Sequence, residues 1–157
     1  MAAVATTAAG GTRPTEKEAK FFAFDPTRKE KTFEAALVPG ACDYPATCVA
    51  ERKVFTTTGD KLLVFDPQTM KVTHTIALPG AQLAISLGRH RSGKVVGLTT
   101  KGVYLFDPGK NVVVHAAPAP VTVKCGFALV EDAVFFGSNA ELWRYTLPRD
   151  FGFSGPE

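Results

Sequence analysis

Apolar and polar positions alternate along this chain in short runs, and the runs are bounded by Gly, Pro, Asn and Asp. Runs of this length are typical of β-strands, because an amphipathic helix needs a period of 3.6 residues sustained over ten or more positions. The pattern predicts an all-β chain. Its expected strands cover residues 21–25, 32–38, 46–50, 53–58, 61–66, 72–78, 82–87, 94–99, 102–107, 111–116, 123–130, 133–137 and 142–147.

The tripeptide Phe-Asp-Pro occurs three times, beginning at Phe24, Phe65 and Phe106, and successive copies are 41 residues apart. A fixed period of this size indicates a repeat architecture, and about 40 residues with four strands is the dimension of one β-propeller blade. Pro fixes φ for the second position of a turn, and Asp accepts hydrogen bonds from the amides that follow. Each copy is therefore predicted to be a hairpin turn, with its aspartate engaged locally rather than on a shared metal.

Proline also ends the strand that follows each copy. Because proline cannot donate to a central ladder, these positions mark strand exits, where the chain crosses from the outermost strand of one blade to the innermost strand of the next. The three prolines are Pro39, Pro79 and Pro120. If each blade ends at one of these prolines, the Phe-Asp-Pro strand is the third strand of its blade. The stretches around Cys48, Ile85 and Phe127 are then innermost strands.

Two units, 61–80 (KLLVFDPQTMKVTHTIALPG) and 101–120 (KGVYLFDPGKNVVVHAAPAP), resemble repeats of the β-propeller superfamily, closest to the quinoprotein-like and YVTN-like bacterial repeats. Segment 93–102 (GKVVGLTTKG) resembles the strand-turn-strand that precedes the hairpin in such repeats. The resemblance covers residues 21 to about 147 and implies an architecture. The Trp-Asp ends of WD repeats, the double glycine of kelch repeats and the tryptophan docking motif of quinoprotein dehydrogenases are absent, so no catalytic residue or cofactor carries over.

We expect residues 1–20 to be a flexible N-terminal tail, 21–147 a partial β-propeller and 148–157 a C-terminal tail. The propeller would have about three blades of four antiparallel strands, with two of them whole (about 45–78 and 82–116). Closed propellers have at least four blades, and an open blade exposes a strand edge and an apolar face. Either the remainder of a larger propeller or a homo-oligomer would complete it. In the second case, strands 123–147 of one copy would take strand 32–38 of another, giving about six blades from two chains.

The composition limits the classes of partner that the sequence predicts. The net charge is +3, and Lys and Arg are scattered through turns, so the sequence predicts no nucleic-acid partner. No apolar run approaches the roughly 20 residues of a membrane helix, and no signal peptide is recognisable. The chain as given would be cytoplasmic, or extracytoplasmic if excised from an exported protein. Cys48 and Cys125 are expected to be buried thiols, while a Cys42–Cys48 bridge remains open.

Several residues are candidates for binding. Backbone amides near Gly93, with Arg and Lys around them, suit an anion, although a solvated turn is the simpler interpretation. This candidate ligand site comprises Arg89, His90, Arg91 and Lys94, and a second one on the opposite face comprises Asp43 and Tyr44. Candidate interface residues are Trp143, Tyr145 and Phe127, for which a core position is the alternative. His74 and His115 occupy equivalent positions on outer strands, and Glu34 aligns with them if one extra turn residue is allowed.

No nucleophile elbow, P-loop, Rossmann glycine pattern or metal-ligand spacing is present in the sequence. The predicted function is a β-propeller-type binding or assembly module without catalytic residues or cofactors, which self-associates through open blade edges and takes a carbohydrate or protein ligand. The alternative is a fragment of a larger bacterial propeller enzyme, such as a lyase, lactonase or glycan-degrading enzyme, with its active site in other blades. A β-sandwich of the same hairpins is a third architecture, but it does not require a strict period.

Overall fold

The computed structural model describes residues 2–4 and 17–149, and these residues form β-strands, turns and loops without a helix. None of them therefore belongs to a helix that could cross a membrane. Of the tails predicted at residues 1–20 and 148–157, residues 1, 5–16 and 150–157 lie outside the described residues. The strands are β1 (Ala2–Val4), β2 (Phe21–Asp25), β3 (Glu30–Ala35), β4 (Thr47–Ala50), β5 (Lys53–Thr58), β6 (Lys61–Asp66), β7 (Lys71–Ala77), β8 (Gln82–Arg89), β9 (Val95–Thr99), β10 (Gly102–Asp107), β11 (Val112–Pro118), β12 (Cys125–Val130), β13 (Ala133–Ser138) and β14 (Glu141–Thr146).

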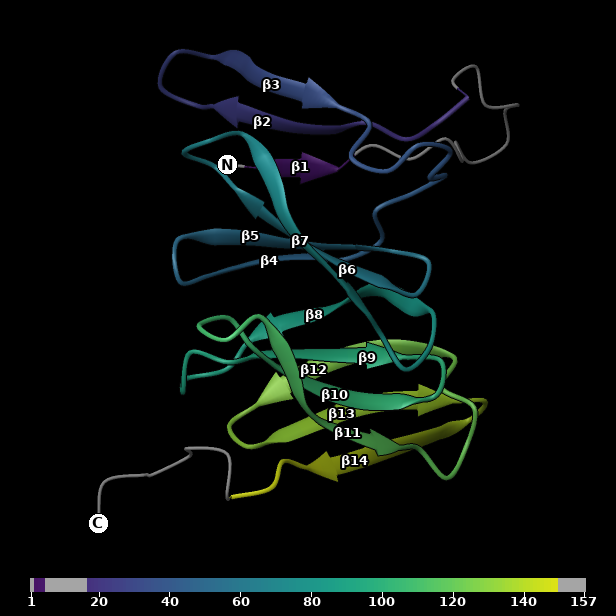
Figure 1. Cartoon of the computed structure of the whole chain (residues 1–157). Helices are drawn as coiled ribbons and strands as arrows, with labels where there is room; N and C mark the ends of the chain where they lie inside the picture. Colours follow the sequence, from purple (N-terminus) through teal and green to yellow (C-terminus); the bar gives the residue numbers. More distant parts are fainter. Residues whose placement is uncertain (1, 5–16, 150–157) are drawn as a thin grey trace.

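The strands form four antiparallel sheets in which sequence neighbours pair. We name them sheet A (β1–β3), sheet B (β4–β7), sheet C (β8–β11) and sheet D (β12–β14). The sheets follow one another in chain order, each stacked on the one before (Figure 1). The predicted order of strands within a blade is confirmed, because β6 and β10, which carry Phe-Asp, are the third strands of sheets B and C. Strand β1 was not predicted; it pairs with β2 in the place of a second strand.

The first strand of each later sheet lies beside the first strand of its neighbour, since β8 contacts both β4 and β12. The backbone N–H of Ile85 on β8 also donates to the carbonyl of Pro45, just before β4, at 2.8 Å. Two complete four-stranded sheets are flanked by two three-stranded sheets, and sheets B, C and D are joined along their first strands. These sheets are blades of a partial β-propeller.

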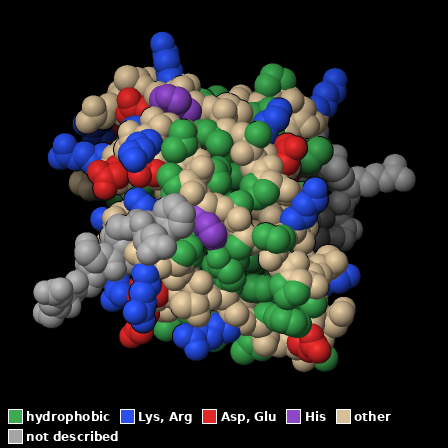
Figure 2. All heavy atoms as spheres, turned by 60° about the horizontal axis from the view of Figure 1, so that its bottom comes forward, with side chains coloured by type: hydrophobic (Ala, Val, Ile, Leu, Met, Phe, Trp, Pro, Cys, Tyr) green, Lys and Arg blue, Asp and Glu red, His purple; other side chains and the backbone are tan. Residues whose placement is uncertain are grey.

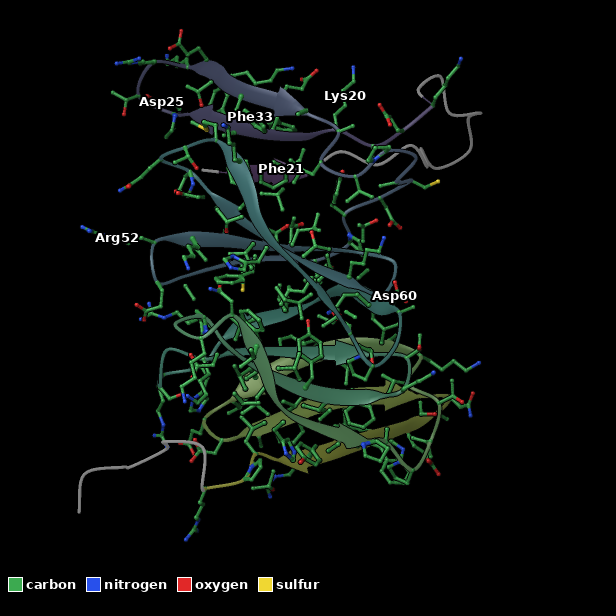
Figure 3. All side chains as sticks on the ribbon, viewed as in Figure 1. Lys20, Phe21, Asp25, Phe33, Arg52 and Asp60 are labelled. Atoms are coloured by element: carbon green, nitrogen blue, oxygen red, sulfur yellow. The ribbon has the colours of Figure 1, made fainter. Side chains whose placement is uncertain are left out.

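The third strands of sheets B and C are buried on both faces, and they form the core. In β6 the side chains from Leu62 to Phe65 are at most 1% exposed. In the second and third Phe-Asp-Pro copies the aromatic ring points to the preceding sheet. The ring centre of Phe65 lies 5.0 Å from that of Phe21 on sheet A, and the ring centre of Phe106 lies 5.5 Å from that of Phe55 on sheet B. Figure 3 shows Phe21 and Phe33 lying at the boundary between sheets A and B.

The Phe-Asp-Pro copies form equivalent hairpin turns, as predicted. Asp25 accepts the backbone N–H of Thr27 at 2.8 Å, and Asp66 accepts that of Gln68 at 2.8 Å. Asp107 accepts the N–H of Gly109 at 2.9 Å. Each aspartate thus accepts a hydrogen bond from its own turn. The residue four positions after each aspartate has a left-handed backbone conformation, with φ of 55° at Lys29, 55° at Met70 and 54° at Asn111.

The alignment of Glu34 with the two histidines is wrong. The three turns have the same length, and Phe33 pairs with Ala23 where His74 pairs with Val64 and His115 with Leu105. No extra turn residue has to be allowed for, so Phe33 is the repeat equivalent of the histidines.

The cysteine predictions are corrected in one respect. None of the three cysteines forms a disulfide, but Cys125 is exposed rather than buried. Its position on β12 faces away from sheet C, whereas Cys48 packs against the core between sheets B and C. Burial raises the pKa of the Cys48 thiol to about 12, so this thiol stays protonated and unreactive at neutral pH.

We predict that the turn aspartate Asp66 makes stability depend on pH. The N–H of Gln68 lowers the pKa of Asp66 below its usual 3.8, so the ionised form stabilises the fold above that pH, and this contribution is lost as the pH falls through the folded-state pKa. Asp66→Asn keeps a turn acceptor but not the charge. Urea unfolding from pH 6 to pH 3 should therefore show the stability advantage of the wild type over this variant shrinking toward low pH. A constant difference would contradict the prediction.

Candidate functional site

The predicted anion site at the turn between β8 and β9 is a tight hairpin. The N–H of His90 donates to the carbonyl of Lys94 at 2.8 Å, and the N–H of Gly93 donates to the carbonyl of His90 at 2.9 Å. The His90 side chain is buried, and its Nε2 lies 3.0 Å from Oδ1 of Asp132 in the turn between β12 and β13. In the neutral imidazole, Nδ1 accepts the N–H of Ser92 at 3.1 Å, so Nε2 carries the proton and donates it to Asp132.

The basic side chains of this turn are engaged by carboxylates. Nη2 of Arg91 lies 2.7 Å from Oδ2 of Asp132, and Nζ of Lys94 lies 3.3 Å from Oδ2 of Asp107. A shallow pocket of about 140 Å³ is bounded by Arg89, His90, Arg91, Leu129 and Glu131, so it mixes both signs of charge. The turn thus joins sheets C and D through polar contacts. Anion binding by Arg89, His90, Arg91 and Lys94 remains a prediction.

The second candidate ligand pair is split between the core and the surface. Tyr44 is 3% exposed, and its hydroxyl accepts the backbone N–H groups of Leu37 at 2.8 Å and Val38 at 3.1 Å. Its ring packs edge-on against Phe21. Asp43 is exposed beside it. Tyr44 therefore fastens the loop between β3 and β4 to the core between sheets A and B.

The three candidate interface residues lie between sheets C and D of the same chain. Phe127, Trp143 and Tyr145 are half-buried and pack against the core formed by these two sheets. The Tyr145 hydroxyl lies 2.7 Å from Nε2 of His115 on β11, and burial raises the pKa of this tyrosine. These residues support the contact between two sheets of one chain, and other side chains occupy the opposite face of sheet D.

That opposite face of sheet D is largely apolar. Strand registers place three rows of side chains on it, alternating with the rows that face sheet C. Val130 is 54% exposed and Leu142 is 78% exposed, and Arg144 is the charged residue among them. The rows are Val130–Ala133–Thr146, Ala128–Phe135–Arg144 and Cys125–Gly137–Leu142. We call this surface the front face of sheet D.

Sheet A has a corresponding back face, which points away from sheet B. Phe21 packs toward sheet B, so strand alternation places Phe22 and Phe24 on the back face. On β3 the residues paired with them are Glu34 and Lys31. Lys31 lies 5.9 Å above the ring of Phe22 and forms an ion pair with Glu34. Sequence analysis missed both faces as candidate surfaces, although strand alternation together with the repeat register could have revealed them.

A buried network of hydrogen bonds links the third strand of sheet C to its first strand. The hydroxyl of Tyr104, which is fully buried, donates to Oε1 of Gln82 at 2.9 Å, and Nε2 of Gln82 donates to the Ser86 hydroxyl at 2.7 Å. The Tyr104 ring lies across Gly97, where a Cβ would come within 2.1 Å of it. Among the described residues no group of three His, Cys, Asp or Glu side chains could hold a metal ion.

No protein-family model matches the sequence, and no curated protein matches it. Solved β-propeller structures do match the fold. Hydrazine synthase from Kuenenia stuttgartiensis matches with a TM-score of 0.65 and 11% identity, over 83% of this chain and 40% of the solved chain. BBS1N in complex with ARL6DN matches with a TM-score of 0.57 and 15% identity, over 82% of this chain and 46% of the solved chain.

At these identities the likeness shows the fold. The chain is a partial β-propeller. It spans less than half the length of the solved propeller chains that it matches.

We predict that the contact between His90 and Asp132 contributes more to stability than the exposed ion pair beside it. His90→Ala leaves a cavity and removes one of the two contacts of Asp132, which keeps Arg91, and it should cost about 2–3 kcal/mol of unfolding free energy. Arg91→Ala removes a side chain that is 61% exposed and should cost less than about 1 kcal/mol. Urea unfolding of both variants measures the difference, and equal costs would contradict this assignment.

Proposed function

We propose that this chain is a propeller-type assembly module that self-associates through its end sheets. The observation that carries the proposal is the front face of sheet D, where Arg144 is the charged residue in three rows of mostly apolar side chains. Contiguous apolar patches with a polar rim on soluble proteins mark interaction surfaces. A group of hydrophobic side chains gathers near the centre of the view from the sheet D end, with charged side chains toward its margin (Figure 2).

The internal sheets support the same proposal. Sheet C is covered on both faces, and its third strand β10 is buried from Gly102 to Phe106. Among the residues that the structure describes, sheet C covers one face of sheet D. Its strand β14 pairs with β13 and, within the described part of the chain, with no fourth strand. Sheet D therefore presents an apolar face and a row of backbone hydrogen-bonding groups, both of which a partner would cover.

The geometry favours stacking of whole sheets over the exchange of a strand between copies. In an exchange, strand β3 of one copy would complete sheet D of another. Strand β3 is paired with β2, which is already a third strand, and β14 holds the same third position in sheet D. Adding the β2–β3 hairpin to sheet D would place two third strands in one blade. Stacking sheet D of one copy face to face on a sheet of another avoids this conflict.

A larger propeller is the second candidate, and one observation favours it. The chain covers 40% and 46% of the two solved propeller chains described above, so further blades of one polypeptide could cover the same faces. In that case a ligand or an active site would lie in those blades. A binding role for carbohydrate or protein fits either candidate, because propeller loops on both sides of the sheets carry contacts.

We predict that the native particle has twice the 16.8 kDa mass of the chain. Analytical ultracentrifugation over a 100-fold range of concentration measures it. Since apolar area rather than charge would drive association, the dimer should persist when the salt concentration is raised to 1 M. A monomer at every concentration would overturn self-association and leave the larger propeller as the better explanation.

A further inference from the structure

The front face of sheet D is open to solvent, whereas the equivalent face of sheet B is covered. Phe135 is the repeat equivalent of Phe55, because each is the third residue of its second strand. Phe55 is 0% exposed, since sheet C packs on it. On the front face of sheet D, Leu142 is 78% exposed and Val130 is 54% exposed. Among the described residues this face therefore lacks the neighbour that its equivalent in sheet B has.

The side chains of the front face differ in size between its two outer strands. In the middle row, Ala128 on β12 stands on one side of the sheet and Arg144 on β14 on the other. In the last row, Cys125 on β12 stands across from Leu142 on β14. Strand β12 therefore carries the small side chains of these rows and β14 the large ones, with Phe135 between them on β13.

We propose that the front face of sheet D docks on the same face of a second copy, about a two-fold axis that runs along β13. This inference rests on the proposed self-association and names its interface. The axis places β12 of each copy against β14 of the other, and Phe135 meets Phe135 of the second copy at the centre. The contact is isologous, so it closes at two copies.

Size and charge select this axis. Two directions of the axis keep the strands of both sheets aligned, as sheets that pack face to face prefer. An axis along β13 puts Arg144 over the small Ala128 of the second copy, and Leu142 over Cys125, so that large and small side chains interdigitate. An axis across the strands would put each strand over its own copy. Arg144 would then face Arg144 of the second copy, and the like charges would repel each other.

The interface is small, so the dimer should be weak. Each copy contributes three rows of three side chains, whereas a standard interface uses about 20–30 residues a side. We expect a dissociation constant on the order of 10 µM. The concentration series that measures the mass of the native particle should therefore extend above this value.

Leu142→Lys should weaken the dimer. A two-fold interface receives the substitution twice, and each copy places an ammonium group in an apolar contact, so the dissociation constant should rise at least about tenfold. Because Leu142 is 78% exposed, the fold should persist, which circular dichroism checks. Val49→Lys is the matched control: Val49 is 59% exposed but lies on β4 of sheet B, so its dimer should be unchanged.

Leu142→Cys tests the direction of the axis. In the proposed dimer the introduced thiol lies over Cys125 of the second copy, and a thiol oxidant should join the two copies by a disulfide that a non-reducing gel detects. Within one copy these positions are separated by β13, so they are about 10 Å apart, which exceeds the roughly 7 Å that a disulfide spans between Cα atoms. An axis across the strands would put residue 142 over Thr146 instead.

Two controls make the cross-link specific. Leu142→Cys combined with Cys125→Ser should give no cross-linked dimer, although Cys42 is still exposed. Thr146→Cys places a thiol on the same strand and face, but the proposed axis puts it over Val130 of the second copy, so it should cross-link much less than Leu142→Cys.

The outcomes separate this inference from the proposed function. A weakened Leu142→Lys dimer with native circular dichroism, together with the specific cross-link, supports the inference. A wild-type dimer that survives Leu142→Lys, or that Leu142→Cys fails to cross-link, overturns this interface and leaves self-association intact. A wild-type chain that is monomeric at every concentration overturns both, and slow alkylation of Cys125 in that monomer would identify a segment of the chain itself as the cover of this face.

Discussion

The contact on which this structure depends is the packing of the second and third Phe-Asp-Pro phenylalanines, Phe65 and Phe106, onto the preceding sheet. Phe65 and Phe106 are at most 1% exposed, and each meets aromatic rings of another sheet. Burying one such ring contributes about 1.5–3 kcal/mol, and none of this is available to a sheet on its own. Stability therefore arises at the boundaries between sheets, as in other repeat proteins, and every blade needs a neighbour on each face.

Polar contacts also join neighbouring sheets at their boundaries. They explain why several residues predicted to bind a ligand already have partners within the chain. His90 and Arg91 of sheet C meet Asp132 of sheet D, and His115 meets Tyr145 across the same boundary. A buried histidine with both ring nitrogens hydrogen-bonded fixes the relative position of two turns more strictly than apolar packing does. The densest basic stretch of the sequence thus joins two blades through His90 and Arg91.

Local chemistry made much of the fold predictable, while tertiary geometry decided the rest. Strands 53–58, 61–66 and 102–107 were predicted to the residue because turn residues bound them on both sides. Strand β1 has no such boundaries, and it forms because it pairs with β2. The contact between His90 and Asp132 joins positions 42 residues apart, which periodicity cannot reveal. The direction of Trp143, toward sheet C, follows from strand alternation only once the sheet and its neighbour are known.

The two end faces then follow from the repeat itself. A strand whose side chains are apolar on both faces can pack against two neighbouring sheets, and Phe135 on sheet D holds the repeat position that Phe55 holds inside the chain. A heterologous contact either closes into a ring or grows without limit, and the rotation between successive units decides which, whereas an isologous contact ends at two copies. Inside this chain the A–B and B–C boundaries share the packing of a Phe-Asp-Pro ring on aromatic rings of the preceding sheet, and the C–D boundary is filled by aliphatic side chains together with Trp143 and Tyr145. A further sheet packed against either end, whether from a second copy or from additional blades of one polypeptide, would continue the curvature that builds a propeller.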